Sequence, residues 1–377
     1  MRVLHTSDWQ LGMTRHYLAG EAQARFSEAR LEAVTRLGEL AAAEGCVCVV
    51  VAGDVFETSH PDARTVARTL ERLARFTVPV YLLPGNHDPL DPGSIWRSPI
   101  FQDRCPTHVE VLDGPEARTP VEGLEIVGAP WPSKQPLGDL TAEACEAAPA
   151  DGARRLVVGH GGVAEVSGGF EAAGTIELSR LRRAVSDGRV RYVALGDRHS
   201  ATRVDDDGHV WYSGAPEPTD YDEVDPGTAL VVDLGPAVPE VTRHEVGTWR
   251  FHLLRHAVDT DEDLDRLEAL LDALDEPSRA IVKLGLEGTL DLRQVARLDA
   301  LLEERALRFG ALEHPQRHRD IAVRATDDDV ATLELTGYAA VARDALHARA
   351  TAGGHDGEVA TDALSLLLRL AGHEEAT

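Results

Sequence analysis

Short apolar runs that stop at polar residues are the main pattern of the first 200 positions. Five such runs end at an Asp, Asn or His, and in four of them a Gly precedes the first polar group. The five runs occupy positions 2–8, 46–54, 80–88, 156–160 and 192–199. Their apolar parts predict buried strands, whereas position 21 to position 44 shows the one-sided apolar pattern of a helix. This alternation favours an α/β sheet over an all-β sandwich.

The pattern changes beyond position 205. Extended segments at 210–213, 229–234 and 241–246 are predicted to be antiparallel strands, with a turn at 205–208. Around residue 247 a smaller unit begins, in which strands alternate with amphipathic helices. Its strands are predicted at 251–258, 280–286 and 321–325, and its helices at 261–274 and 291–304.

The chain end is predicted to be helical, at 334–350 and 358–371, with an apolar last helix. We therefore divide the chain into a first domain of residues 1–247, a small α+β domain of residues 248–330 and a helical segment of residues 331–377. The last segment is a candidate for docking a partner protein, although it could equally pad the small domain.

The polar residues that end the five runs are expected to meet at one edge of the sheet, because ligands of an open α/β sheet collect at the carboxyl ends of its strands. Their oxygen and nitrogen atoms are typical donors for divalent metal ions, and their number favours more than one ion. The residues are Asp8, Asp54, Asn86, His87, Asp88, His160, Asp197 and His199.

Two divalent ions about 3.5–4 Å apart can activate a hydroxide and neutralise a phosphate during phosphodiester cleavage. Asp54 follows the most apolar run and is the best candidate for a bridging carboxylate. We predict that His87 is catalytic and donates a proton to the leaving oxygen. We predict that Asp88 is the second catalytic residue and orients His87.

Each motif alone also has a structural explanation. A Gly-Asp pair after a strand is a common turn, and His160 could be an ordinary core histidine. Near the first strand end, His5, Arg15 and His16 could contact a substrate phosphate, but packing or surface roles are favoured. Trp9 could stack on a base, although packing near the site is again the simpler interpretation.

The combined pattern resembles that of the calcineurin-like metallophosphoesterase superfamily, which is Asp-x-His, Gly-Asp, Gly-Asn-His-Asp/Glu, Gly-His and Gly-His-x-His. The chain matches it at Asp8-Trp9-Gln10, Gly53-Asp54, Gly85-Asn86-His87-Asp88, Gly159-His160 and Gly196-Asp197-Arg198-His199. The segments His5-Thr6-Ser7-Asp8-Trp9 and Tyr212-Ser213-Gly214-Ala215-Pro216-Glu217 are similar to SbcD-type nuclease subunits, the bacterial counterparts of the Mre-eleven nucleases. The resemblance implies a layered α/β sandwich, a smaller α+β capping domain and a helical C-terminal segment.

By position, the resemblance places Asp8, Gln10, Asp54 and His199 around one metal ion. It places Asp54, Asn86, His160 and Asp197 around the other. Gln10 and Asp197 depart from the pattern, which has His at both positions. Their oxygen donors favour Mn²⁺, with Mg²⁺ as the alternative, over Zn²⁺. The same two changes could also lower metal affinity.

The resemblance implies a two-metal DNA nuclease that hydrolyses phosphodiester bonds at DNA ends in repair and recombination. It implies an SbcC-like coiled-coil ATPase as partner, and a homodimer. Two alternatives stay open. One is a stand-alone phosphoesterase acting on nucleotides or phosphoproteins, and the other is a weakened scaffold with altered metal ligands.

Charge and hydropathy narrow these alternatives. The formal net charge of −26 excludes non-specific wrapping of nucleic acid by the whole surface, so a DNA contact must be local or shared with a partner. No apolar stretch approaches the ~20 residues needed to span a membrane. The N-terminus begins in a predicted strand without a signal peptide, so we expect a cytoplasmic protein that does not bind membranes.

Overall fold

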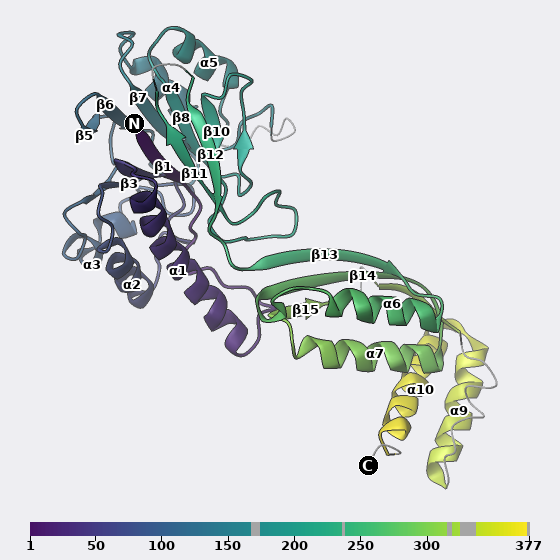
Figure 1. Cartoon of the computed structure of the whole chain (residues 1–377). Helices are drawn as coiled ribbons and strands as arrows, with labels where there is room; N and C mark the ends of the chain where they lie inside the picture. Colours follow the sequence, from purple (N-terminus) through teal and green to yellow (C-terminus); the bar gives the residue numbers. More distant parts are fainter. Residues whose placement is uncertain (167–173, 236–237, 315–318, 325–336, 375–377) are drawn as a thin grey trace. The chain divides into compact units, whose positions relative to one another are not determined.

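The computed structural model of the chain describes residues 1–166, 174–235, 238–314, 319–324 and 337–374. The chain forms two compact units, which are visible in Figure 1. The first comprises Met1–His16 and Gln23–Trp249, and the second comprises Tyr17–Ala22 and Arg250–Thr377. The predicted boundary at residue 330 lies outside the described residues, so the division into three domains stays a prediction.

The first unit contains two six-stranded sheets. In the first sheet β1, β2, β3 and β4 run parallel, whereas β11 lies antiparallel between β1 and β12. Its strands, in spatial order, are β12 (Glu240–Glu245), β11 (Thr228–Asp233), β1 (Arg2–Thr6), β2 (Cys48–Val51), β3 (Val80–Leu82) and β4 (Val109–Val111). The sequence pattern predicts a single sheet edge at the site, whereas the structure divides the strands between two sheets.

The second sheet is also mainly parallel. Its strands, in spatial order, are β5 (Arg118–Val121), β6 (Leu124–Gly128), β7 (Arg155–His160), β8 (Tyr192–Gly196), β10 (Val210–Tyr212) and β9 (Thr202–Arg203). The predicted antiparallel pairing is found for β11 with β12 and for β10 with β9, but β10 also runs parallel to β8, which the sequence pattern did not predict. The reason is the turn at Asp205, whose carboxylate accepts hydrogen bonds from the backbone of Gly208 and Val210. This turn forms the antiparallel β9–β10 pair, which places β10 beside β8 in the same direction.

The two sheets face each other across an apolar layer, and helices cover their outer faces. Alternation along β2 shows this: Cys48 and Val50 pack into the layer between the sheets, while Val49 and Val51 pack into the core on the opposite face. The helices of the first unit are α1 (Glu21–Ala43), α2 (Ala63–Leu73), η1 (Ile95–Arg97), α3 (Pro99–Gln102), α4 (Leu140–Ala147) and α5 (Leu178–Ser186). The layered α/β sandwich predicted from the sequence is confirmed.

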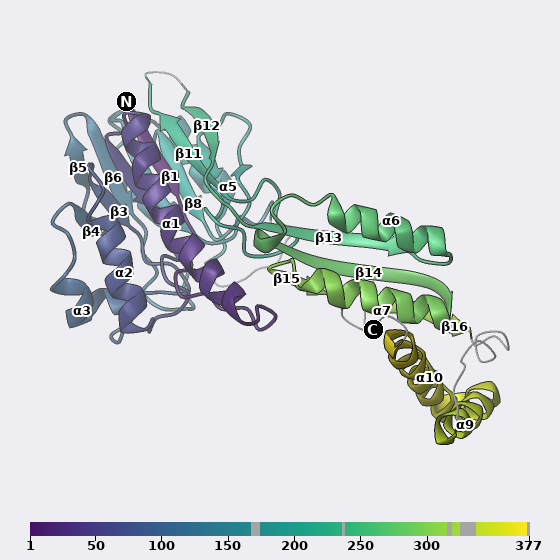
Figure 2. The ribbon, with the colours of Figure 1, turned by 60° about the horizontal axis from the view of Figure 1, so that its bottom comes forward.

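The second unit is built on a parallel four-stranded sheet. Its strands are β13 (Arg250–Ala257), β14 (Ala280–Asp291), β15 (Ala311–Glu313) and β16 (Arg319–Arg324). The sequence pattern did not reveal the short β15. Helices α6 (Asp261–Asp272) and α7 (Leu292–Ala306) lie along the β13–β14 pair, as Figure 2 shows, and η2 (Pro277–Arg279) precedes β14.

Two further helices, α9 (Tyr338–Ala352) and α10 (Gly354–Glu374), pack against each other near the chain end, and α10 also contacts α7. The first residues of the helix predicted at 334–350 lie outside the described residues. No helix in the described part of the chain is long and apolar enough to cross a membrane.

Candidate metal centre

Strained backbone marks the strand ends where the sequence predicts metal ligands. Six described residues other than glycine have a positive φ, and four of them are predicted ligands. These four are Asp8 (φ 53°), Gln10 (φ 45°), Asp54 (φ 54°) and Asp197 (φ 100°). Such backbone costs energy and is retained where the surrounding structure holds it, commonly at functional sites. The chain therefore maintains strained turns where β1, β2 and β8 end.

Glycines allow the strand ends of the two sheets to approach closely. A Cβ atom on Gly53 would lie 2.1 Å from Nδ1 of His160. A Cβ atom on Gly196 would lie 1.9 Å from the backbone oxygen of Ala52 and 2.9 Å from the same His160 nitrogen. All three distances are below van der Waals contact, so only glycine fits at either position. Gly53 and Gly196 are thus required by the packing around His160.

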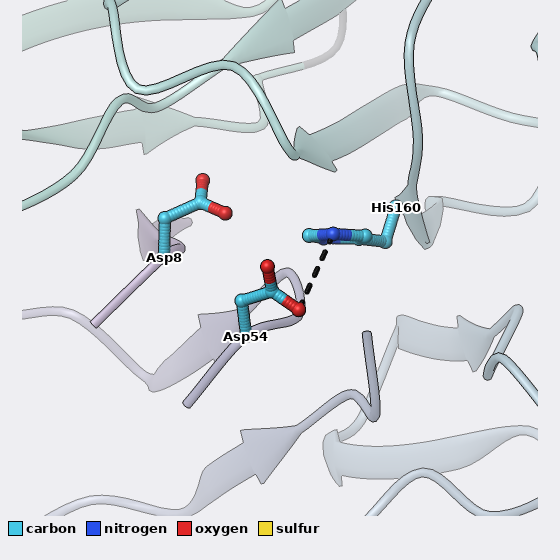
Figure 3. Close-up of side chains that lie close together, drawn as sticks. All are labelled: Asp8, Asp54 and His160. Carbon is cyan, nitrogen blue, oxygen red and sulfur yellow. Dashed lines mark ion pairs between the residues drawn. The ribbon is translucent and has the colours of Figure 1, made fainter. Parts of the chain in front are cut away.

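Asp8, Asp54 and His160 form the centre of the site, and each is buried (Figure 3). Each offers a ligand atom that lies within 4.8 Å of the others. Nδ1 of His160 lies 2.8 Å from the backbone oxygen of Ala52 and donates to it. This bond leaves Nε2 facing Oδ1 of Asp54 at 3.5 Å. A backbone carbonyl therefore orients the imidazole as metal-binding histidines are usually oriented.

The rest of the second predicted ligand set gathers around the same nitrogen. Nε2 of His160 lies 2.7 Å from Oδ1 of Asn86 and 3.8 Å from Oδ1 of Asp197. Asp54, Asn86, His160 and Asp197 come from the ends of β2, β3, β7 and β8, so both sheets contribute. The structure brings all four residues together.

The electrostatics of this cluster fit a cation. Burial opposes protonation of His160, but Asp54, Asp8 and Asp197 outweigh burial and hold its pKa well above the ordinary value. Burial raises the pKa of Asp8 in spite of the nearby histidines. Burial also opposes the charge of Asp54, but His160 offsets it and lowers the pKa of that carboxyl. The cluster thus has an excess of negative charge, which a bound divalent ion would balance.

The first predicted ligand set is looser. Nε2 of His199 lies 3.9 Å from Oδ1 of Asp8 and 3.3 Å from Nε2 of Gln10. Oε1 of Gln10 is buried and has no hydrogen-bond partner among the described residues. A buried acceptor without a partner is costly, and a hard cation would satisfy it. With carboxylate, amide and imidazole donors, the two sets fit divalent ions such as Mn²⁺ or Mg²⁺.

His87 and Asp88 do not form the predicted pair. The Asp88 carboxylate accepts hydrogen bonds from the backbone nitrogens of Phe56 and Gly85, both at 2.9 Å. Nδ1 of His87 instead donates to the backbone oxygen of Glu57 at 2.8 Å. The prediction that Asp88 orients His87 is therefore wrong. Asp88 is fully buried, which raises its pKa well above the ordinary value, and the backbone groups around it need its carboxylate to fix the loop.

His87 itself lies at the site. Its backbone nitrogen donates to Oδ1 of Asp54 at 2.9 Å, and its Nε2 lies 3.9 Å from Oδ2 of Asp54. Its side chain is 36% exposed and lines a cavity of about 460 Å³. The other lining residues include Gln10, Arg15, Glu57, Asp197, Arg198, His199, Thr219, Asp220, Asp222 and Glu223. The cavity is lined by residues of both ligand sets and by two arginines, Arg15 and Arg198.

Other residues near the first strand end have structural roles. Nε1 of Trp9 donates to Oγ1 of Thr6, and Trp9 is 1% exposed, so it packs and does not stack on a base. His5 is fully buried between the sheets, next to the hydroxyl of Tyr192 and the backbone oxygen of Leu195. Among these candidates, only Arg15 lines the cavity.

Sequence reasoning missed the loop that supports His199. Nδ1 of His199 lies 2.5 Å from Oγ1 of Thr219 and 3.3 Å from Oε1 of Glu223. Burial opposes protonation of His199, but Glu223 and Asp8 outweigh it and raise the pKa to about 8. No local signal distinguishes Glu223, because it stands among other acidic residues of a loop.

The family model of the calcineurin-like phosphoesterases matches residues 1–232, which is more than half of the chain. The chain belongs to the calcineurin-like phosphoesterase family. Membership makes hydrolysis of phosphate esters the expected class of reaction, and the matched region contains every predicted ligand.

Three relatives of this phosphoesterase are named as nucleases or repair proteins. The DNA double-strand break repair protein Mre11 of Sulfolobus acidocaldarius is 22% identical over 90% of this chain and 88% of its own length. The D subunit of the nuclease SbcCD of Rhodobacter capsulatus is 28% identical over 87% of this chain and 91% of its own length. The protein of the same name from Bacillus subtilis is 30% identical over 38% of this chain and 37% of its own length. The first two similarities extend beyond the phosphoesterase domain into the second unit.

Proposed function

We propose that this phosphoesterase is a two-metal DNA nuclease that hydrolyses phosphodiester bonds at DNA ends during repair. The observation that carries the proposal is the buried cluster of Asp8, Asp54 and His160, whose donor atoms lie within 4.8 Å of one another. The choice of DNA as substrate is supported by the relatives named as Mre11 and as the D subunit of SbcCD, which align with most of the chain.

In this proposal Asp8, Gln10, Asp54 and His199 hold one ion, and Asp54, Asn86, His160 and Asp197 hold the other. When bound, a pair of divalent ions generates hydroxide at neutral pH and neutralises charge on the phosphate, and we propose Mn²⁺ as that ion. Asp54 is central to both sets, since its carboxylate lies within 4.8 Å of ligand atoms of Asp8, in the first set, and of His160, in the second.

The remaining residues bind the substrate and move a proton. Arg15 and Arg198 line the cavity and are placed to bind a phosphate oxygen. His87 presents Nε2 to the cavity while the Glu57 carbonyl holds Nδ1, so a protonated His87 can donate to the leaving oxygen. Asp88 contributes indirectly by holding the loop that carries His87.

We propose that an SbcC-like ATPase helps to hold the DNA, since a net charge of −26 does not favour binding of a polyanion by this chain alone. Helices α9 and α10 expose apolar side chains, among them Tyr338 at 90% and Val341 at 69%, which supports a docking role. A homodimer is part of the same proposal.

The decisive experiment is cleavage of linear double-stranded DNA with Mn²⁺. We expect cleavage by the wild-type protein and none by Asp54→Asn or His87→Ala. Asp207→Asn is a matched control, because Asp207 is an exposed turn residue away from the cavity, and it should cleave normally. Hydrolysis of nucleoside monophosphates or a phosphopeptide without DNA cleavage would overturn the proposal in favour of a stand-alone phosphoesterase.

A weakened scaffold is the second candidate, and one observation favours it. The amide nitrogen of Gln10 lies 3.3 Å from Nε2 of His199, the nitrogen that would bind the metal ion. In this arrangement the Gln10 amide occupies the position beside His199 Nε2 where a metal ion would bind. Isothermal titration with Mn²⁺ separates the two candidates, because a scaffold would give no binding heat.

A further inference from the structure

The loop of residues 219–223 forms one wall of the cavity and is tied to His199. Thr219, Asp220, Asp222 and Glu223 line the cavity, while the Glu223 carboxylate is only 4% exposed. That carboxylate accepts hydrogen bonds from the backbone nitrogens of Thr219, at 3.0 and 3.1 Å, and of Asp220, at 3.1 Å. The backbone nitrogen of Val224 donates to Oγ of Ser200, next to His199. The loop is therefore fixed beside the histidine.

The directions of the hydrogen bonds follow from the donors available. An ionised carboxylate only accepts, so the Thr219 hydroxyl donates to Glu223. The Thr219 oxygen then accepts from Nδ1 of His199, which lies 2.5 Å away. The proton on the neutral imidazole is therefore on Nδ1, and the lone pair is on Nε2.

The lone pair on Nε2 of His199 faces the other residues proposed to bind the first metal ion. Nε2 lies 3.9 Å from Oδ1 of Asp8, whereas Glu223 and Thr219 contact the opposite nitrogen. A carboxylate behind a metal-binding histidine fixes the tautomer and makes the ligand more basic. The need is greater here, because Gln10 supplies a neutral amide where the family pattern has an imidazole.

We propose that Glu223, acting through Thr219, is a positioning residue that holds His199 in the metal-binding tautomer and so sets the affinity of the first ion site. This inference rests on the metal assignment in the proposed function. It assigns a role to two residues that lie outside the family motifs.

The test compares Mn²⁺ binding by the wild-type protein and by Glu223→Gln. Binding is measured by isothermal titration in the absence of substrate. A Gln side chain can donate to the Thr219 oxygen, which would turn the Thr219 hydroxyl toward Nδ1 of His199 and move the proton to Nε2. We expect about 10- to 100-fold weaker binding at one of the two sites. Thr219→Val should weaken Mn²⁺ binding similarly. Thr219→Ser keeps the hydroxyl and should bind Mn²⁺ like the wild-type protein.

Asp225→Asn is the matched control, because it removes one charge two residues after Glu223, while Asp225 is exposed and pairs with Arg243. It should bind Mn²⁺ like the wild-type protein. The ¹⁵N chemical shifts of the His199 ring in metal-free protein give an independent readout when they are recorded well above the pKa of about 8, where the ring is neutral. Nδ1 should then carry the proton in the wild type, and Nε2 should carry it in Glu223→Gln.

The outcomes separate this inference from the proposed function. If the wild-type protein binds no Mn²⁺ and the ring shifts still change, the proposed function fails while the tautomer control stands. If the wild-type protein binds Mn²⁺ and Glu223→Gln binds it equally well, the inference is overturned. It is also overturned if Glu223→Gln further weakens binding in a His199→Ala background, since the effect would then not act through His199.

Discussion

The two histidines proposed as metal ligands are supported in different ways. Nδ1 of His160 donates to a backbone oxygen, that of Ala52, and the ring is fully buried against Gly53 and Gly196. Nδ1 of His199 contacts the side chains of Thr219 and Glu223, and the ring is 25% exposed at the cavity. A backbone carbonyl thus orients His160, and no side-chain substitution can remove it. The side chains that orient His199 can be removed by substitution.

This difference predicts how changes in each half of the site will act. Changes around His160 should lower the stability of the whole first unit, because they disturb the packing of two sheets. Changes around His199 should lower stability less and should act mainly on metal affinity. In the proposed metal site, the residues around His160 would therefore form a fixed part, while the residues around His199 would adjust the metal affinity.

The largest effect is expected for Gly53→Ala. Its Cβ would lie 2.1 Å from Nδ1 of His160, and the residue has a φ of 93°. Strain and overpacking together should lower the free energy of unfolding by about 4 kcal/mol, measured by urea denaturation. Gly45→Ala is the matched control, because Gly45 has a φ of 63° with nothing within 4 Å of its added Cβ. It should cost only about 1 kcal/mol, and equal losses in the two variants would contradict the packing argument.

Alanine at the two histidines tests the comparison directly. In metal-free protein, His160→Ala removes a buried group that bonds to Ala52 and balances the charge of Asp54, so we expect a loss of about 3 kcal/mol. His199→Ala, at a partly exposed position, should cost about 1 kcal/mol. Urea denaturation with a chelator present measures both, and a larger loss for His199→Ala would reverse our account of the two halves.

The two halves also differ in how far the sequence predicts them. The His160 half could be predicted because each residue follows an apolar run and a Gly, and strand ends converge in any α/β sheet. The support of His199 could not, since Glu223 is distant in sequence and resembles its acidic neighbours in the loop. Asp88 was assigned the wrong partner because sequence adjacency to His87 does not show which backbone groups need an acceptor.

A third histidine shows what burial does without carboxylates. His5, on β1, donates from Nε2 to the backbone oxygen of Leu195 on β8, and its Nδ1 accepts from Tyr192. Burial lowers the pKa of His5 to about 3, although the bond to Leu195 partly opposes this. Burial also acts on His160, but three carboxylates reverse the sign there. The two histidines are equally buried, so the neighbouring carboxylates account for the opposite shifts of their pKa values.

The pH dependence of stability tests this contrast. Between the unfolded pKa near 6.5 and the folded pKa near 3, the unfolded state binds more protons at His5, so stability falls as pH falls. This single group should remove about 2 kcal/mol between pH 6.5 and pH 5. Urea denaturation of the wild-type protein and His5→Gln across this range should show the difference in unfolding free energy shrinking by that amount. A difference that is constant with pH would show that His5 does not remain neutral when folded.

The smallest effect, and the most informative for the metal ions, is expected at the two positions that depart from the family pattern. Gln10→His should tighten Mn²⁺ binding roughly tenfold, because an imidazole replaces a neutral amide and the Gln10 nitrogen no longer covers Nε2 of His199. Histidine is tolerated at the φ of 45° found there. Asp197→His should weaken Mn²⁺ binding, because it removes a negative charge 3.8 Å from His160. Isothermal titration of both variants, repeated with Zn²⁺, should show opposite shifts for Mn²⁺ and a gain for Zn²⁺ in both. If the Mn²⁺ affinity of both variants changed in the same direction, the residues around His160 and those around His199 would respond alike. The proposed difference between the two halves of the site would then be wrong.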